Sequence, residues 1–215
     1  MPLGFNLGYL ITAAMVLVAV LGTVRWPRLD RGGQWLVTAV IASTAFVPFS
    51  LARLFAGRSN HLLNEVSLLV ETGLILAAFA WWQPTAARQR VMWWIEVGFV
   101  TTWIVAQAIQ GPAADFSYIS IPVAGLVKVG TAGFTLVGRI QAADGRWTDS
   151  LWFWATLGVM VIYGTEVVLD PLWAQALGMR DDLSVAAFAV NTVGNVVGYG
   201  LMARGLWRLP PVAAA

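Results

Sequence analysis

The chain has 215 residues, of which 59% are hydrophobic and only 11% are charged, and its mean hydropathy is +0.72. Soluble domains contain about 45–50% apolar residues, so this composition excludes an ordinary soluble protein and indicates an integral membrane protein. The net charge of +2 gives no reason to expect a nucleic-acid partner. Without cysteine, and with His61 as the single histidine, the chain offers no thiolate or histidine cluster, so we expect no metal site and no cofactor.

Apolar runs recur along the whole chain, each close to the roughly 20 residues that cross a bilayer as a helix. The runs are 5–24, 33–53, 61–82, 91–110, 118–140, 150–173 and 183–206. The connections between them are short and rich in turn residues, which leaves no room for a soluble domain. The sequence therefore predicts a single all-α domain over 1–215, a polytopic bundle of seven transmembrane helices in the cell membrane.

The arginines predict the orientation of this bundle. Nine of them fall on one side of a seven-helix arrangement, namely Arg25, Arg28, Arg31, Arg88, Arg90, Arg139, Arg146, Arg204 and Arg208. Only Arg53, Arg58 and Arg180 fall on the other side. Because basic loops stay in the cytoplasm, we expect the N-terminus outside and the C-terminus in the cytoplasm. Ten of the 12 tryptophans gather near the arginine-rich side, as an interfacial belt does.

The run 61–82 carries a carboxylate, Glu71, at a depth where charge is costly. At 1.5 Å of rise per residue, Glu71 lies about 15 Å from His61, near the middle of a hydrocarbon core about 30 Å thick. An ionisable group at that depth faces protein or water and marks a functional site or a buried partner. Glu65 either joins the same site from an adjoining stripe or extends outward to the interface.

Other polar stripes reach similar depths. The only lysine, Lys128, lies near mid-membrane in 118–140, and we expect it to pair with Glu71 or Glu166, because an unpaired charge there is costly. The remaining stripe residues are Trp103, Gln107, Tyr163, Asp170, Phe188, Asn191 and Asn195. We expect these side chains to converge with the charged groups on one site inside the bundle.

Two chemistries fit such a site. One is a structural ion pair that serves packing or specificity alone. The other is a cavity in which a carboxylic acid, kept neutral by desolvation, donates a proton. A lysine partner holds one carboxylate in its ionised form, so only the other of Glu71 and Glu166 is then free to act as the acid. The rings of Trp103, Tyr163 and Phe188 either pack or stabilise a cation.

Three segments carry a resemblance to a known family: VETGLILAA at 70–78, GPAADFSYISIPVAGLVKVGTAGFTLVGRI at 111–140 and GRWTDSLWFWATLG at 145–158. Over 64–206 the chain resembles the small seven-helix integral-membrane terpene cyclases of fungal meroterpenoid and indole-diterpene pathways. The resemblance implies a metal-independent isomerase or lyase of terpenoid biosynthesis that cyclises a prenyl or epoxyprenyl substrate after protonation.

The resemblance also implies roles for individual residues. Glu71 stands at the family's third-helix acid position. The chain has Asn191 or Asn195 where the family has its last-helix aspartate, so the catalytic acid is expected to be Glu71 or Glu166. The polar stripes, and not the resemblance, predict the residues that would hold the substrate: Trp103, Gln107, Lys128, Tyr163, Asp170, Phe188, Asn191 and Asn195.

Other classes compete with the cyclase interpretation. A transporter, channel or small-ligand sensor would use Glu71, Lys128, Glu166 and Asp170 as a proton or ion relay, although the chain shows no internal repeat. A retinal protein also combines seven helices with a buried lysine, but its lysine belongs on the last helix.

The expected partners are membrane lipids and a lipid-like or prenyl small molecule, and an oligomer is compatible with the many small residues.

Overall fold

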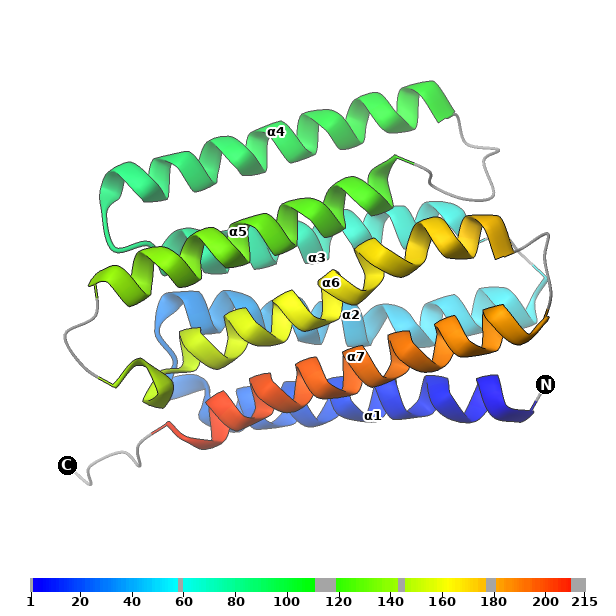
Figure 1. Ribbon diagram of the computed structural model, residues 1–215, viewed down its shortest axis with the longest axis horizontal. Coiled ribbons are helices and arrows are strands. Elements are labelled where there is room, and N and C mark those ends of the chain that lie inside the picture. Colours follow the sequence, from blue (N-terminus) through cyan, green and yellow to red (C-terminus); the bar gives the residue numbers. More distant parts are fainter. Residues whose placement is uncertain (1, 58–59, 111–118, 143–145, 177–180, 210–215) are drawn as a thin grey trace.

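The computed structural model describes residues 2–57, 60–110, 119–142, 146–176 and 181–209, and these ranges are helical apart from short connections. Two 3-10 turns, η1 (Trp26–Arg28) and η2 (Trp147–Asp149), precede α2 and α6. The long helices are α1 (Pro2–Arg25), α2 (Arg31–Phe55), α3 (His61–Trp81), α4 (Ala86–Gln110), α5 (Ser120–Ala142), α6 (Leu151–Ala176) and α7 (Asp181–Trp207). Consecutive long helices run antiparallel to each other in one bundle (Figure 1).

Each long helix contains a segment long and apolar enough to cross a membrane, 7 in all. The prediction of an all-α membrane bundle is therefore confirmed. Most helix ends lie within a few residues of the predicted ones, but α4 begins at Ala86, five residues before the apolar run that starts at 91. Arg88, Gln89 and Arg90 are good helix formers, so the helix begins in a polar turn that hydropathy does not detect.

The helices differ in how far they are enclosed. The most extensive contacts join α6 to α7, followed by those of α2 with α3, α5 with α6 and α1 with α7. In contrast, α4 packs on α3 and α5 and lies at the edge of the bundle (Figure 1). The interior between α2, α3, α5, α6 and α7 is therefore the part of the molecule most shielded from lipid.

Small residues set the close approach of α6 to α7. A Cβ atom at Gly158 would lie 2.6 Å from the carbonyl oxygen of Gly198, and one at Gly198 would lie 2.7 Å from the carbonyl oxygen of Gly158. Glycine pairs of this kind let helix backbones approach in a membrane, where van der Waals packing drives association. The two helices consequently place Tyr163 and Tyr199 around the same interior space.

The helix ends near the nine arginines lie together at one end of the bundle, on the left in Figure 1. We call this the arginine-rich end. Asp30 links two helices at this end. Its Oδ1 accepts a hydrogen bond from the backbone N–H of Gly33 at the start of α2, at 2.7 Å, and its Oδ2 accepts one from Nε1–H of Trp82, at 2.9 Å. The N-terminal cap of α2 and the end of α3 are thereby joined by one carboxylate.

Candidate functional site

Three side chains from different helices form what we call the central cluster: Glu71 of α3, Lys128 of α5 and Tyr163 of α6. The ammonium nitrogen of Lys128 lies 3.8 Å from Oε1 of Glu71 and 3.4 Å from the centroid of the Tyr163 ring. The hydroxyl of Tyr163 donates a hydrogen bond to the same Glu71 oxygen. Lys128 is only 1% exposed. The prediction that Lys128 pairs with Glu71 or Glu166 is confirmed, with Glu71 as the partner.

The helical register explains why these groups meet. Glu71 and Lys128 lie about 15 Å and about 12 Å from the starts of α3 and α5, which begin at the same end of the bundle. One turn before Lys128, a Cβ atom at Gly125 would lie 2.7 Å from Cγ2 of Val167, so glycine lets α5 approach α6 closely. The lysine side chain therefore reaches the Tyr163 ring instead of lipid.

A small cavity adjoins Glu71 on the side of α2 and α7. Its volume is about 10 Å³, room for roughly one water molecule. Its walls are Leu36, Ala39, Val40, Ser43, Glu71, Ile75, Tyr163, Tyr199 and Met202. Among the described residues, the buried Oγ of Ser43 has no hydrogen-bond partner. The cavity thus offers polar groups for a water and is far too small for a prenyl chain in this conformation.

Exposure separates the two charged members of the central cluster. The side chain of Glu71 retains 19% exposure, whereas that of Lys128 retains 2%. Because Lys128 is enclosed and fixed between a carboxylate and a ring face, it acts as a stationary positive charge. Glu71 is therefore the charged member of the central cluster that keeps some exposed surface.

A second buried carboxylate, Glu65, lies nearer to the start of α3 and is 2% exposed. Its Oε2 accepts hydrogen bonds from Nε1 of Trp103 at 3.0 Å and from Nε2 of Gln107 at 2.6 Å. Gln107 also donates to Oγ of Ser120 at 3.4 Å. We call these four residues the Glu65 cluster. Neither expectation for Glu65 holds: its carboxylate does not extend to the interface, and it bonds to side chains of α4 and not to those of the central cluster.

The structure therefore divides the predicted site residues between different places. Trp103 and Gln107 bind Glu65 and not Glu71, because α4 packs on the side of α3 that carries Glu65. On α7, the side-chain amide of Asn195 donates to the carbonyl oxygen and to Oδ1 of Asn191, both at 3.0 Å, so these two amides bond within their own helix.

The remaining predicted residues lie on α6 and α7. Glu166 and Phe188 are both partly buried, and Glu166 lies within electrostatic reach of Tyr199, as does Glu71. Asp170 belongs to α6, but its side chain lies outside the described part of the chain. Among the described residues, no group of three or more histidine, cysteine or acidic side chains is arranged to hold a metal ion.

Sequence reasoning did not single out Ser43 or Tyr199 as site residues and left the place of Glu65 open. Tyr199 follows Asn195 by four residues, so extending the polar stripe of α7 by one turn would have found it. Trp103 and Gln107, also four residues apart, both carry N–H donors, and a buried donor pair implies an acceptor on a neighbouring helix. Ser43 gave no such signal, because isolated serines in membrane helices usually serve packing.

Chemically, the central cluster joins a reachable carboxylate, a fixed cation and a phenol at one point inside the bundle. A carboxyl group beside a phenol has the chemistry for proton exchange, and the adjoining cavity has room for roughly one water molecule. Comparisons of the chain with protein-family models, with curated proteins and with solved structures found no match. Because a fold does not fix a function, the case for function rests on the geometry of the site.

Proposed function

We propose that the chain is a multi-pass protein of the cell membrane in which Glu71 exchanges a proton inside the bundle, as part of a transporter, channel or small-ligand sensor. The observation that carries the proposal is the contact of Glu71 with Lys128 and Tyr163 beside a cavity the size of one water. Ionisable residues inside membrane spans commonly mark proton and ion pathways.

Each member of the central cluster has a distinct part in this proposal. The ammonium group of Lys128 lies 3.8 Å from Oε1 of Glu71, and the Tyr163 hydroxyl orients the same carboxyl group. When Glu71 takes up a proton, Lys128 loses its counter-charge and keeps only the ring face of Tyr163. Protonation therefore weakens the link between α3 and α5, and two states of the bundle with different packing can follow from one proton.

The surroundings supply neighbours for proton transfer. Ser43 and Tyr199 line the water-sized cavity next to Glu71, so a proton can pass through a water held there. Glu65 lies about 9 Å from Glu71 along the axis of α3, toward the end of the bundle that is opposite the arginine-rich end. It provides a second carboxylate between the central cluster and the end of the bundle at which α3 begins.

The test of proton exchange is infrared difference spectroscopy of the purified protein in membranes, recorded across a pH titration. We expect a buried carboxyl band that changes with pH in the wild type and is lost in Glu71→Gln. The exposed carboxylate Asp149 supplies the matched control, so Asp149→Asn should keep the band. A spectrum that Glu71→Gln leaves unchanged would contradict the proposal. Proton flux in proteoliposomes with a pH-sensitive dye then separates a transporter or channel from a sensor.

The proposed orientation places the arginine-rich end in the cytoplasm. Nine arginines end up at this end of the bundle, as the positive-inside rule requires. The chain has no cysteine, so single cysteines report location directly. We expect Ala87→Cys, beside Arg88, to resist an impermeant thiol reagent in intact cells, and Ala56→Cys, exposed at the opposite end, to react. The reverse pattern would invert the topology.

The terpene-cyclase interpretation is the second candidate, and one observation favours it. The ring of Tyr163 lies 3.4 Å from the ammonium nitrogen of Lys128, so this ring can stabilise a positive charge, and a carbocation would have to take the place of that ammonium. A cyclase would use Glu71 or Glu166 as its acid. However, the 10 Å³ beside Glu71 requires the helices to separate before a prenyl chain can enter.

Membranes incubated with linear and epoxidised prenyl substrates test this second candidate. A cyclised product that disappears in Glu71→Gln or Glu166→Gln would favour the cyclase. The absence of product from every substrate, together with a pH-dependent carboxyl band assigned to Glu71, would favour the proton-exchange function.

A further inference from the structure

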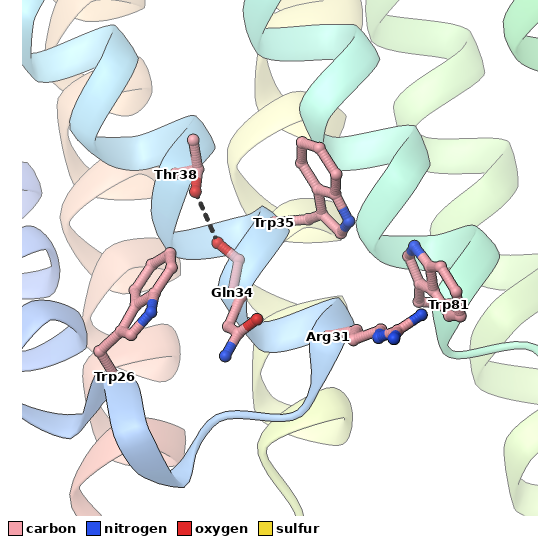
Figure 2. A pocket seen from close by; sticks show the side chains of 6 residues that line it. All are labelled: Trp26, Arg31, Gln34, Trp35, Thr38 and Trp81. Carbon is pink, nitrogen blue, oxygen red and sulfur yellow. Dashed lines mark hydrogen bonds between the residues drawn. The ribbon is translucent and has the colours of Figure 1, made fainter.

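A groove opens at the arginine-rich end, away from the central cluster, between η1, the start of α2 and the end of α3. Its volume is about 370 Å³, within the range of small-ligand sites. Its lining residues are Trp26, Arg31, Gln34, Trp35, Thr38 and Trp81 (Figure 2). The groove thus combines three indole rings with one positive charge and two polar side chains.

Arg31 supplies the charge of the groove. Its guanidinium carbon lies 4.7 Å from the centroid of the Trp81 ring, and Figure 2 shows the side chain extending toward that ring. No carboxylate in the described part of the chain lies within ion-pair distance of Arg31. The adjacent Asp30 is engaged instead with Trp82 and Gly33. The N–H groups of Arg31 are therefore available to an external anion, and a guanidinium suits the oxygens of a phosphate.

The walls of the groove indicate where that anion comes from. Trp26, Trp35 and Trp81 are 38%, 40% and 37% exposed, and they lie at the ends of membrane-spanning helices. Half-exposed tryptophans at this position lie at the level of lipid headgroups. Further along α2 toward the centre of the bundle, Ile41 is also exposed and can contact an acyl chain. The groove therefore faces the headgroup layer and continues into an apolar surface.

We propose that this groove binds the phosphate headgroup of a membrane phospholipid, with preference for an anionic lipid. Arg31 contacts the phosphate, and Trp26 and Trp35 flank the glycerol region. Gln34 offers the second N–H of its side-chain amide, because its Nε2 already donates to the carbonyl oxygen of Leu29 at 3.4 Å. The surrounding charge supports an anionic ligand, because Arg25, Arg28 and Arg31 outnumber the single carboxylate Asp30 in 25–31. Basic pockets between helices are typical sites for anionic headgroups.

The test uses the purified full chain in detergent and native mass spectrometry with phosphatidylglycerol and phosphatidylcholine of identical acyl chains. The wild type should retain more phosphatidylglycerol, and Arg31→Gln should lower that retention about fivefold. Arg90→Gln is the matched control, because Arg90 is an exposed arginine of the same end that does not line the groove. Its retention should equal that of the wild type.

Further results of the same experiment distinguish a headgroup site from diffuse surface charge and from a site for a free anion. Equal retention by Arg31→Gln and the wild type, or an equal loss in Arg31→Gln and Arg90→Gln, would overturn it, the second by indicating diffuse surface charge. Displacement of the lipid by millimolar inorganic phosphate would assign the groove to a free anion and also overturn it. If Arg31→Gln does not fold, Trp35→Ala replaces it: reduced retention supports the headgroup site, and unchanged retention contradicts it.

Discussion

Helix α3 carries two glutamates, the buried Glu65 and the partly buried Glu71, that the bundle accommodates in different ways. Glu71 faces the ammonium group of Lys128 and the hydroxyl of Tyr163. Glu65 instead receives hydrogen bonds from the uncharged N–H groups of Trp103 and Gln107. The same residue type on one helix is thus balanced by a full counter-charge in one cluster and by neutral donors in the other.

Depth gives the physical reason for this difference. Glu65 lies about 6 Å from the start of α3 and Glu71 about 15 Å, so only Glu71 is near the middle of the apolar layer. The cost of a charge falls toward the interface, where water and headgroups are close. Near the start of α3, the neutral donors around Glu65 can hydrogen-bond its carboxyl group whether or not it carries a proton. At the centre, a proton on Glu71 would leave the charge of Lys128 without a counter-charge. We therefore expect protonation to change the packing of the bundle more at Glu71 than at Glu65.

The largest expected effect is the loss of the central counter-charge. Lys128→Met leaves the partly buried Glu71 without its cation, and we expect a loss of about 3 kcal/mol in the free energy of unfolding. Denaturant unfolding in detergent micelles measures it. The double variant Lys128→Met/Glu71→Gln should recover part of the loss, because no buried charge then lacks a partner. If Lys128→Met is as stable as the wild type, the ion pair of Lys128 and Glu71 does not stabilise the bundle.

Replacing each glutamate by glutamine sharpens the contrast. Glu71→Gln strands Lys128 and should approach the cost of Lys128→Met, whereas Glu65→Gln keeps an acceptor for Trp103 and Gln107 and should cost less than about 1 kcal/mol. Glu65→Leu removes the acceptor and should cost about 1–3 kcal/mol, because two buried donors lose their partner. Equal costs for the two glutamine variants in the same unfolding assay would show that the clusters do not differ as described.

Two substitutions of Tyr163 separate the contribution of its hydrogen bond from that of its ring. Tyr163→Phe removes the hydroxyl that Glu71 accepts and keeps the ring below Lys128, so we expect a loss of about 1 kcal/mol. Tyr163→Leu removes the ring as well and should cost more, by the contribution of the cation–π contact and by lost packing. Thermal unfolding of both variants measures the difference. If the two variants unfold alike, the ring contributes nothing to holding Lys128.

The smallest effect is expected at the exposed pair of Asp149 and Arg208, whose nearest charged atoms lie 3.6 Å apart. Their side chains are 63% and 40% exposed, so water and salt screen the attraction. Asp149→Asn should change the free energy of unfolding by at most about 1 kcal/mol, and less at high salt. This variant calibrates the assay, and a large loss here would show that exposure does not separate the two kinds of ion pair.

Hydropathy and helical rise were enough to predict a large part of the molecule. The seven helices follow from apolar runs of spanning length, and the depths of Glu71 and Lys128 follow from 1.5 Å per residue. Because charge is costly at those depths, a carboxylate partner for Lys128 could also be predicted from the sequence. These inferences depend on composition and distance along one helix, which a sequence contains in full.

Which polar groups meet depends on how the helices pack in three dimensions. The choice of Glu71 over Glu166 as the partner of Lys128 depends on the rotation of each helix about its axis and on the close approach of α5 to α6 at Gly125. The peripheral packing of α4 brings Trp103 and Gln107 to Glu65. A polar stripe states which face of a helix is polar, but neighbouring helices determine what that face contacts, because interhelical packing depends on the shapes of all the side chains between them.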